Sequence, residues 1–162
     1  MISNIEFRIG NFLRQLGLKL ATAESCTGGL ISDRITDIPG SSDYFIGGIV
    51  AYSYEAKVAL LNVSWDTLNK KGAVSPETVL EMAQGARKAL GAHIAVSVSG
   101  IAGPGGATPE KPVGTTWIGL VTPEGKWTRH FIWEGDRAEN KAKSAEAALQ
   151  MILDYLEGRL ET

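Results

Sequence analysis

The stretch KLATAESCTGGLISDRITDI, residues 19–38, decides the fold class. Residues 19–25 have the alternating character of a β-strand that ends at Ser25. Two glycines then open an amphipathic segment, residues 28–38, which predicts a helix that Pro39 and Gly40 end. A strand that turns directly into a helix is typical of α/β proteins, in which ligands bind at the carboxyl ends of the strands.

The rest of the chain continues this alternation and ends in a hairpin. A first helix is expected from the cap Ser3, with Glu6 in a capping box, to Gly17. A second clear helix follows the cap Ser75 and ends at Gly91. The other expected elements are strands at 44–53 and 93–100, a helix at 54–62, hairpin strands at 113–122 and 126–135, and a long helix from Asp136 to about Leu156. This order predicts one α/β domain over residues 1–162, a layered α/β/α arrangement with a mixed sheet.

Composition narrows the class of protein. The 162 residues are 44% hydrophobic and 21% charged, as in ordinary globular proteins. A net charge of −2 and the lack of a basic block argue against a general nucleic-acid surface. The single cysteine cannot form an intramolecular disulfide, which fits a reducing compartment. Because no apolar run approaches ~20 residues and the N-terminus does not read as a signal peptide, we expect a cytoplasmic protein without a membrane span.

Ser25 is the first candidate nucleophile. A strand-to-helix junction holds a hydroxyl rigid and exposed, and the amides of Thr27, Gly28 and Gly29 can face a developing oxyanion. The glycines permit that approach because they have no side chain. The structural alternative is that Ser25 or Thr27 is only the N-cap of the helix, and the stretch read alone favours this alternative.

Cys26 is the rival nucleophile, since a thiol at a helix N-terminus can be activated. Successive strand residues face opposite sides, so Ser25 and Cys26 are not both expected in the site, and a small buried cysteine is the commoner case. The two histidines, His93 and His130, fall in predicted strands and are expected to be structural or surface residues. One cysteine and two scattered histidines form no metal-ligand cluster.

A nucleophilic serine without a histidine needs another base, and Lys57 is the candidate. It follows the strand at 44–53 within AYSYEAK, and lysine becomes a base when burial or neighbouring cations disfavour its charge. Tyr52 lies five positions earlier and is a candidate to relay a proton or to hold the lysine. The alternative is that Lys57 is a solvated helix residue, which is the usual role of a lone lysine.

The loop after the strand at 93–100 is the third polar segment at a strand end. It begins SGIAGPGG, with Ser99 at the end of the strand and Gly100 and Gly103 among its glycines. The loop carries neither a P-loop nor a dinucleotide fingerprint, so it indicates only an anion-binding or substrate-covering loop. Arg137 opens the final helix, where it either binds a phosphate or is a plain surface arginine.

Five blocks occur together in the order TAESCTGGLISDRITDIPGSS, GGIVAYSYEAKVALLNV, GAVSPETVLEMAQGA, SVSGIAGPGGATPEKPVGTTWIGL and GDR. Over nearly the whole chain this set resembles the CinA C-terminal-domain family, the bacterial nicotinamide-mononucleotide deamidases. The resemblance implies a stand-alone amidohydrolase that converts nicotinamide mononucleotide to nicotinate mononucleotide and ammonia, in pyridine nucleotide recycling. It implies a Ser/Lys mechanism with no metal and no other cofactor.

The resemblance also implies residue roles. The family's motifs make Ser25 the nucleophile, Lys57 the general base and Tyr52 an assisting residue. The implied substrate-binding residues are Ser42, Ser99, Arg137, Thr27, Gly28, Gly29, Gly100 and Gly103.

Three positions depart from the family's pattern. Tyr54 stands where an asparagine is usual, Ser99 stands where some members have threonine, and AENKAK at 138–143 lacks an early arginine. Tyr54 and Ser99 are expected at the edge of the substrate pocket, where they bear on the affinity for the substrate. None of the three departures removes the pair Ser25 and Lys57.

Two other functions remain open at this point. One is a non-catalytic nucleotide-binding or interaction module related to competence or the DNA damage response, and the other is a serine amidase for another small amide. The substrate is expected to be the only ligand besides a second copy of the chain in a homodimer, with no nucleic-acid or membrane partner.

Overall fold

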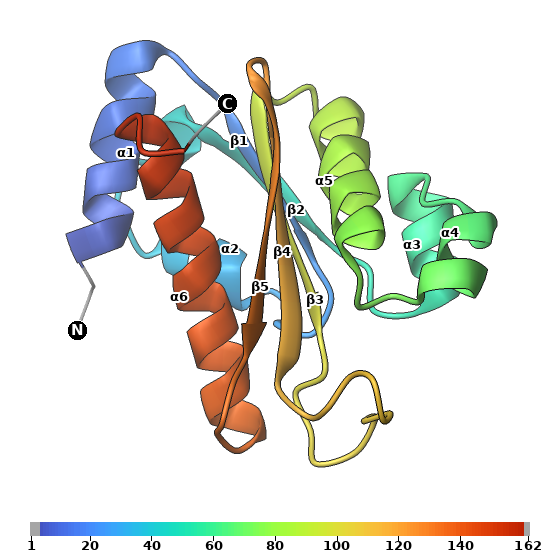
Figure 1. Cartoon of the computed structure of the whole chain (residues 1–162). Coiled ribbons are helices and arrows are strands. Elements are labelled where there is room, and N and C mark those ends of the chain that lie inside the picture. The colour runs from blue at the N-terminus through green and yellow to red at the C-terminus, as the bar shows by residue number, and fades with distance from the viewer. Residues whose placement is uncertain (1–3, 161–162) are drawn as a thin grey trace.

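A computed structural model describes residues 4–160 of the chain (Figure 1). Its five-stranded sheet has the order β2-β1-β3-β4-β5. The strands are β1 (Leu20–Glu24), β2 (Phe45–Val50), β3 (Ile94–Gly100), β4 (Thr115–Thr122) and β5 (Gly125–Ile132). β1 pairs in parallel with β2 and β3, whereas β4 pairs antiparallel with β3 and β5. The predicted mixed sheet and its late hairpin are therefore confirmed.

Helices cover both faces of this sheet (Figure 1). One face carries α1 (Asn4–Leu16), α2 (Leu30–Thr36) and α6 (Arg137–Leu156), and the other carries α3 (Tyr54–Leu61), α4 (Trp65–Lys71) and α5 (Pro76–Leu90). A short 3-10 helix, η1 (Ser41–Asp43), precedes β2. The layered α/β/α arrangement predicted from the order of elements is confirmed.

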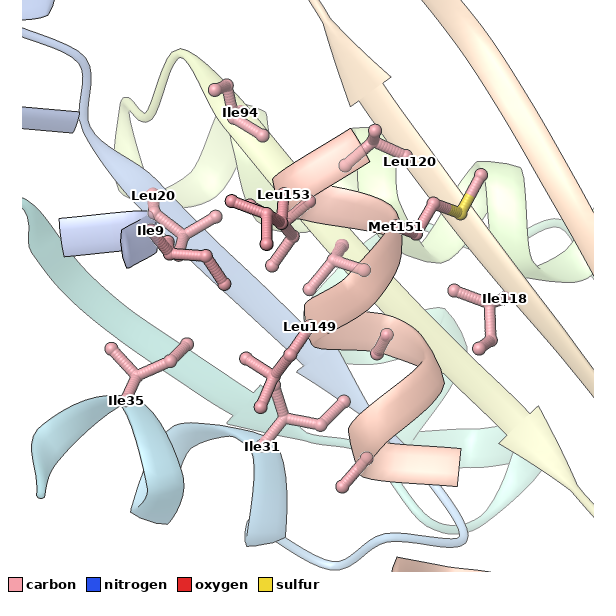
Figure 2. Close-up of a cluster of buried hydrophobic side chains, with 14 of the residues drawn as sticks. Ile9, Leu20, Ile31, Ile35, Ile94, Ile118, Leu120, Leu149, Met151 and Leu153 are labelled. Atoms are coloured by element: carbon pink, nitrogen blue, oxygen red, sulfur yellow. The ribbon is translucent and has the colours of Figure 1, made fainter. Parts of the chain in front are cut away.

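Each face of the sheet has its own apolar core. On the α6 face, Ile9, Leu20 and Leu149 come together from α1, β1 and α6, each at most 1% exposed (Figure 2). The α5 face uses smaller side chains, such as Ala21 and Ala83, so that the helix packs close to the strands. Burial of each large aliphatic side chain contributes about 1.5–3 kcal/mol, and the central strands therefore form a rigid base for the loops at their ends.

Side-chain caps decide where the helices begin. Asp136 accepts a hydrogen bond from the Glu139 amide and Glu139 accepts one from the Asp136 amide, which completes a capping box at α6. Ser75 caps α5 in front of Pro76, as predicted. The expected Ser3 cap lies outside the described residues. The sequence did not predict α4, a seven-residue helix of mostly polar side chains.

The glycine pair of β2 permits close packing. The register between β1 and β2 shifts just after Leu20, which is the irregularity that a glycine in a strand indicates. A Cβ on Gly48 would overlap Thr22 Oγ1 and Ser32 Oγ. Only glycine therefore lets α2 lie against this edge of the sheet, and α2 follows the turn that carries Ser25.

Candidate active site

Ser25 and Lys57 meet at the carboxyl ends of β1 and β2. Ser25 is the first residue after β1, and Lys57 is the fourth residue of α3, the helix that follows β2. Lys57 Nζ lies 2.9 Å from Ser25 Oγ, 3.0 Å from the Ala51 carbonyl oxygen and 2.8 Å from the Tyr52 carbonyl oxygen. The distance to Ser25 is within the range over which a general base takes a proton.

Lys57 is held in the fold without a neutralising partner. The side chain is fully buried, and no ion pair within residues 4–160 includes it. Burial lowers the pKa of Lys57 from 10.5 to about 8, against a smaller opposing effect of the Cys26 thiol. The alternative of a solvated surface lysine is wrong, and a part of the Lys57 population is neutral at neutral pH.

The three contacts of Lys57 suit both protonation states of its amine. A neutral amine has two N–H groups and one lone pair, whereas the ammonium has three N–H donors. The carbonyl oxygens of Ala51 and Tyr52 only accept, so they take the two N–H groups. The third N–H of the ammonium form donates to Ser25 Oγ, and in the neutral form the lone pair takes that direction, which is the direction in which a proton must move to activate the serine.

Glu24 has a role that the sequence-based prediction missed. Its carboxylate is fully buried at the end of β1. It accepts hydrogen bonds from Thr27 Oγ1 at 2.6 Å, from the Ile31 and Ser32 amides at 2.9 Å each and from Ser32 Oγ at 2.7 Å. An anion at a helix N-terminus is favourable, so Glu24 caps α2 and ties it to β1. The signal was present in the sequence, as an acidic residue just before the predicted helix.

The turn between β1 and α2, residues 25–29, is called the Ser25 turn below. Neither Ser25 nor Thr27 caps α2, so the capping alternative is wrong. The Ser25 hydroxyl contacts the lysine, and the Thr27 hydroxyl donates to the buried glutamate. Gly28 and Gly29 have φ values of 60° and 109°, in the left-handed region that glycine adopts without strain. The glycines let the chain turn while the Ser25 hydroxyl stays available for chemistry.

The Ser25 turn also presents amides for a developing negative charge. The Gly28 amide donates to the Ser25 carbonyl oxygen at 3.1 Å, so its expected role as an oxyanion donor is corrected to closing the turn. Within residues 4–160, the amides of Thr27 and Gly29 have no protein acceptor. Thr27 and Gly29 are therefore two amides of the Ser25 turn that are available for an oxyanion.

Cys26 lies next to Ser25 but on the other side of the chain. It is 8% exposed and belongs to the apolar core under α6, whereas Ser25 faces α3. Burial raises the pKa of the Cys26 thiol to about 11. A thiol in this state is protonated at neutral pH and is a weak nucleophile, which agrees with the prediction of a buried structural cysteine.

The histidines lie away from this pair. His93 precedes β3 instead of lying within it, and its Nδ1 accepts a hydrogen bond from the Lys19 amide at 2.9 Å. His130 lies in β5 and stacks on Trp117 with ring centroids 4.4 Å apart. In the described part of the chain, no group of three His, Cys, Asp or Glu side chains is placed to hold a metal ion.

Tyr52 enters the site through its backbone. Its carbonyl oxygen holds Lys57, but its side chain is 63% exposed, so a direct proton relay by the phenol is not what the structure shows. The phenol oxygen instead accepts a hydrogen bond from Arg137 Nη2 at 3.3 Å. Tyr52 thus joins the lysine to the opening of α6.

Arg137 connects three segments around the site. Its Nη1 donates to the Gly103 carbonyl oxygen at 2.7 Å, and its Nη2 contacts Tyr52. A Cβ on Gly100 would lie 2.6 Å from Thr116 Oγ1, so this glycine serves close packing at the end of β3. Ser99 is buried one residue before Gly100. The Ser25 amide donates to the carbonyl oxygen of Val98 in β3, so the carboxyl ends of β1 and β3 lie side by side.

Ser42 does not belong to this edge. It is exposed in η1, which precedes β2, whereas Ser25 follows β1. β1 and β2 run in parallel, from the pair Leu20–Phe45 to the pair Glu24–Val50. Five residues of strand span about 16 Å, so the expected substrate contact at Ser42 is corrected: it lies at the opposite end of the sheet.

No helix among residues 4–160 combines the length and apolar character that crossing a bilayer requires.

The chain is similar to known proteins over most of its length. The family model described as "CinA C-terminal domain" matches residues 2–156. A protein of Halothermothrix orenii named "Putative competence-damage inducible protein" is 51% identical over 149 residues, and a "CinA-like protein" of Desulfotalea psychrophila is 47% identical over 148 residues. Both alignments cover 91% of this chain but 36% of the relative, so the chain spans little more than a third of these relatives.

Solved structures match over nearly the full length of both chains. The competence/damage inducible protein CihA from Agrobacterium tumefaciens has a TM-score of 0.92 at 40% identity, covering 96% of this chain and 95% of its own. A CinA superfamily protein from Klebsiella pneumoniae has a TM-score of 0.92 at 32% identity, with coverages of 96% and 97%. Sequence and fold agree, and the chain belongs to the CinA C-terminal domain family.

Proposed function

We propose that this chain hydrolyses the carboxamide of nicotinamide mononucleotide, giving nicotinate mononucleotide and ammonia. The observation that carries the proposal is the contact of 2.9 Å between Ser25 Oγ and the buried Lys57 Nζ, which has no carboxylate partner in the described chain. A binding module would not need a buried amine in contact with a serine hydroxyl. The choice of nicotinamide mononucleotide as substrate rests on the family resemblance of the motifs.

The reaction would begin with the Ser25 hydroxyl. Neutral Lys57 takes the hydroxyl proton while Ser25 Oγ forms a bond to the amide carbon, whose C=O electron pair moves onto oxygen. The Thr27 and Gly29 amides stabilise that oxyanion, and the loss of one such donor typically raises the barrier by about 3 kcal/mol. The Lys57 ammonium then gives its proton to the leaving nitrogen, and the C–N bond breaks to release ammonia.

A second half-reaction would restore the protein. Lys57, neutral again, removes a proton from a water molecule, and the oxygen of that water attacks the acyl carbon. The C–O bond to Ser25 breaks, the serine oxygen recovers a proton from Lys57, and the carboxylic acid leaves and loses its proton to the solvent. Because Lys57 carries the proton in each transfer to or from Ser25, the cycle needs no histidine.

The test incubates the purified chain with nicotinamide mononucleotide and measures both products. We expect ammonia and nicotinate mononucleotide in equal amounts, and we expect less turnover of nicotinamide and nicotinamide riboside, which lack the phosphate. Tight binding of nicotinamide mononucleotide by calorimetry with no product would favour a non-catalytic module. Faster turnover of an amide without phosphate would favour a different serine amidase.

A further inference from the structure

The loop that follows β3 begins with a buried segment, although loops usually run over the surface of a protein. Ala102 and Gly103 are buried, whereas the residues that come next, 104–110, are exposed. A buried backbone carbonyl needs a hydrogen-bond donor from the protein, because water does not reach it. For both of these residues the donor is a side chain of α6.

Asn140 holds the first of the two carbonyls. It is 2% exposed, on the buried side of α6. Its Nδ2 donates to the Ala102 carbonyl oxygen at 3.0 Å and to the Gly135 carbonyl oxygen at 2.9 Å. Its Oδ1 accepts a hydrogen bond from the Gly135 amide at 3.0 Å. Since both N–H groups of the side chain are used, Asn140 ties the start of the loop to the segment that leads into α6.

Arg137 holds the second carbonyl. It lies three positions before Asn140, so the two side chains are neighbours on the helix surface. Its Nη1 donates to the Gly103 carbonyl oxygen at 2.7 Å. The first turns of α6 therefore fix two successive residues of the loop.

The fixed start of the loop lies beside the nucleophile. The Ser25 amide donates to the Val98 carbonyl oxygen at 3.1 Å, and β3 ends two residues later at Gly100. Ala102 is two residues further along the chain, a span of at most about 7 Å. Residues 101–103 therefore form a wall of the site on the β3 side.

The far end of the loop is tied down next to the helix that carries Lys57. Lys111 Nζ donates to the carbonyl oxygen of Lys71, the last residue of α4, at 2.7 Å. A Cβ on Gly72 would lie 3.2 Å from this Nζ and 3.9 Å from the Tyr54 hydroxyl oxygen. Tyr54 is the first residue of α3, three positions before Lys57. The loop thus extends from α6 to the opening of α3, between the two helices that border the site.

We infer that Asn140 is a positioning residue, which fixes residues 101–103 as the wall of the Ser25–Lys57 site against which the substrate binds. The role in substrate binding rests on the proposed function, whereas the anchoring of the loop does not. Ser25 and Lys57 are held by β1 and α3, and Asn140 contacts neither of them. Loss of the Asn140 side chain should therefore weaken substrate binding and leave the chemical step intact.

The kinetic test compares Asn140→Ala with Ser144→Ala. Ser144 is equally buried one turn further along α6, but its hydroxyl contacts the Asn140 carbonyl oxygen and the Trp133 indole N–H instead of the loop. Both variants lose buried hydrogen bonds and should be less stable to denaturant. Only Asn140→Ala should raise KM for nicotinamide mononucleotide, by about fivefold or more, because only there does the Ala102 carbonyl lose its donor.

The division between KM and kcat decides whether Asn140 acts on binding. In Asn140→Ala, kcat and its pH dependence should stay within about twofold of the unmodified protein, since the Ser25–Lys57 contact is unchanged. An unchanged KM in Asn140→Ala, or an equal rise of KM in Ser144→Ala, overturns the inference.

A second measurement needs no turnover. The Ile101 amide donates to the Thr115 carbonyl oxygen and the Gly114 amide donates to the Ile101 carbonyl oxygen, so both amides report on opening of the base of the loop. Their native-state hydrogen exchange should be about fivefold or more faster in Asn140→Ala and unchanged in Ser144→Ala.

The two measurements separate the inference from the proposed function. Unchanged exchange in Asn140→Ala overturns the anchoring and the inference with it. Faster exchange in Asn140→Ala, together with no ammonia from nicotinamide mononucleotide by the unmodified protein, overturns the proposed function and the role in substrate binding, and leaves the anchoring of the loop standing.

Discussion

The Lys57 amino group lies 2.9 Å from the Ser25 hydroxyl oxygen, and two backbone carbonyls of the preceding segment complete its contacts. Since carbonyl oxygens cannot neutralise a charge, Lys57 is easier to deprotonate than an exposed lysine. The serine is therefore next to a base whose protonation state changes near physiological pH.

The rate of amide hydrolysis should follow the ionisation of Lys57. Burial lowers the pKa of Lys57 to about 8, so kcat/KM should rise with pH through a single ionisation near that value. Lys57→Arg should be inactive at every pH, because arginine does not lose its proton. A pH–rate profile of the free protein measures this. Substantial activity of Lys57→Arg would show that another group is the base.

The same ionisation should appear in the stability of the fold. An unfolded Lys57 has the ordinary pKa of 10.5, and the folded one has a pKa of about 8. Between these values the unfolded chain binds more protons, so the free energy of unfolding should rise with pH there, by at most about 3 kcal/mol. The free energy of unfolding is measured with denaturant at each pH for the unmodified protein and for Lys57→Met. The difference between the two values isolates the contribution of Lys57. If this difference in unfolding free energy did not change between pH 8 and pH 10.5, the result would contradict a Lys57 charge that burial destabilises.

Glu24→Gln should damage both stability and turnover. The amide oxygen of glutamine can still accept from part of the network, but its NH2 group cannot accept from the remaining donors, such as Thr27 Oγ1 or the Ser32 amide. A buried unsatisfied donor costs about 1–3 kcal/mol. Urea unfolding should show that loss, and kcat should fall more than KM changes because the Ser25 turn moves. If Glu24→Gln were less stable but had an unchanged kcat, Glu24 would contribute to the stability of the fold and not to turnover.

Gly48→Ala tests the close packing of α2. The new Cβ would overlap Thr22 Oγ1 and Ser32 Oγ, and such overpacking typically costs about 1–3 kcal/mol. Gly105→Ala is the matched control, because a Cβ there meets nothing within 4 Å. Thermal unfolding should give a lower Tm for Gly48→Ala alone. Equal Tm values for the two variants would mean that α2 can move to accommodate the new Cβ without a loss of stability.

The layers of the fold followed from local patterns in the sequence. The strand before Ser25, the Ser75 cap and the start of the last helix at Asp136 each depend on residues close together in the chain, and each was predicted. α4 was not predicted, because its polar segment WDTLNKK shows no apolar periodicity and depends on the Ser64 cap.

The Ser25–Lys57 pair could be proposed from the sequence, but spacing alone does not bring the two side chains together. The two residues are 32 positions apart, and their contact depends on the parallel pairing of β1 and β2. Ser42 shows the limit of residue-by-residue transfer, because motif resemblance does not tell which end of the sheet a residue occupies. Tyr52 shows a second limit of such transfer. Its backbone carbonyl oxygen accepts a hydrogen bond from Lys57, whereas its phenol contacts Arg137.

The most direct test of the Ser25–Lys57 assignment is ammonia release from nicotinamide mononucleotide by the unmodified protein, Ser25→Ala and Cys26→Ala. All three proteins must first show the same folded circular dichroism spectrum. The unmodified protein and Cys26→Ala should release ammonia at similar rates, and Ser25→Ala should release none above background. Activity that survives in Ser25→Ala and disappears in a folded Cys26→Ala would contradict the assignment of the nucleophile.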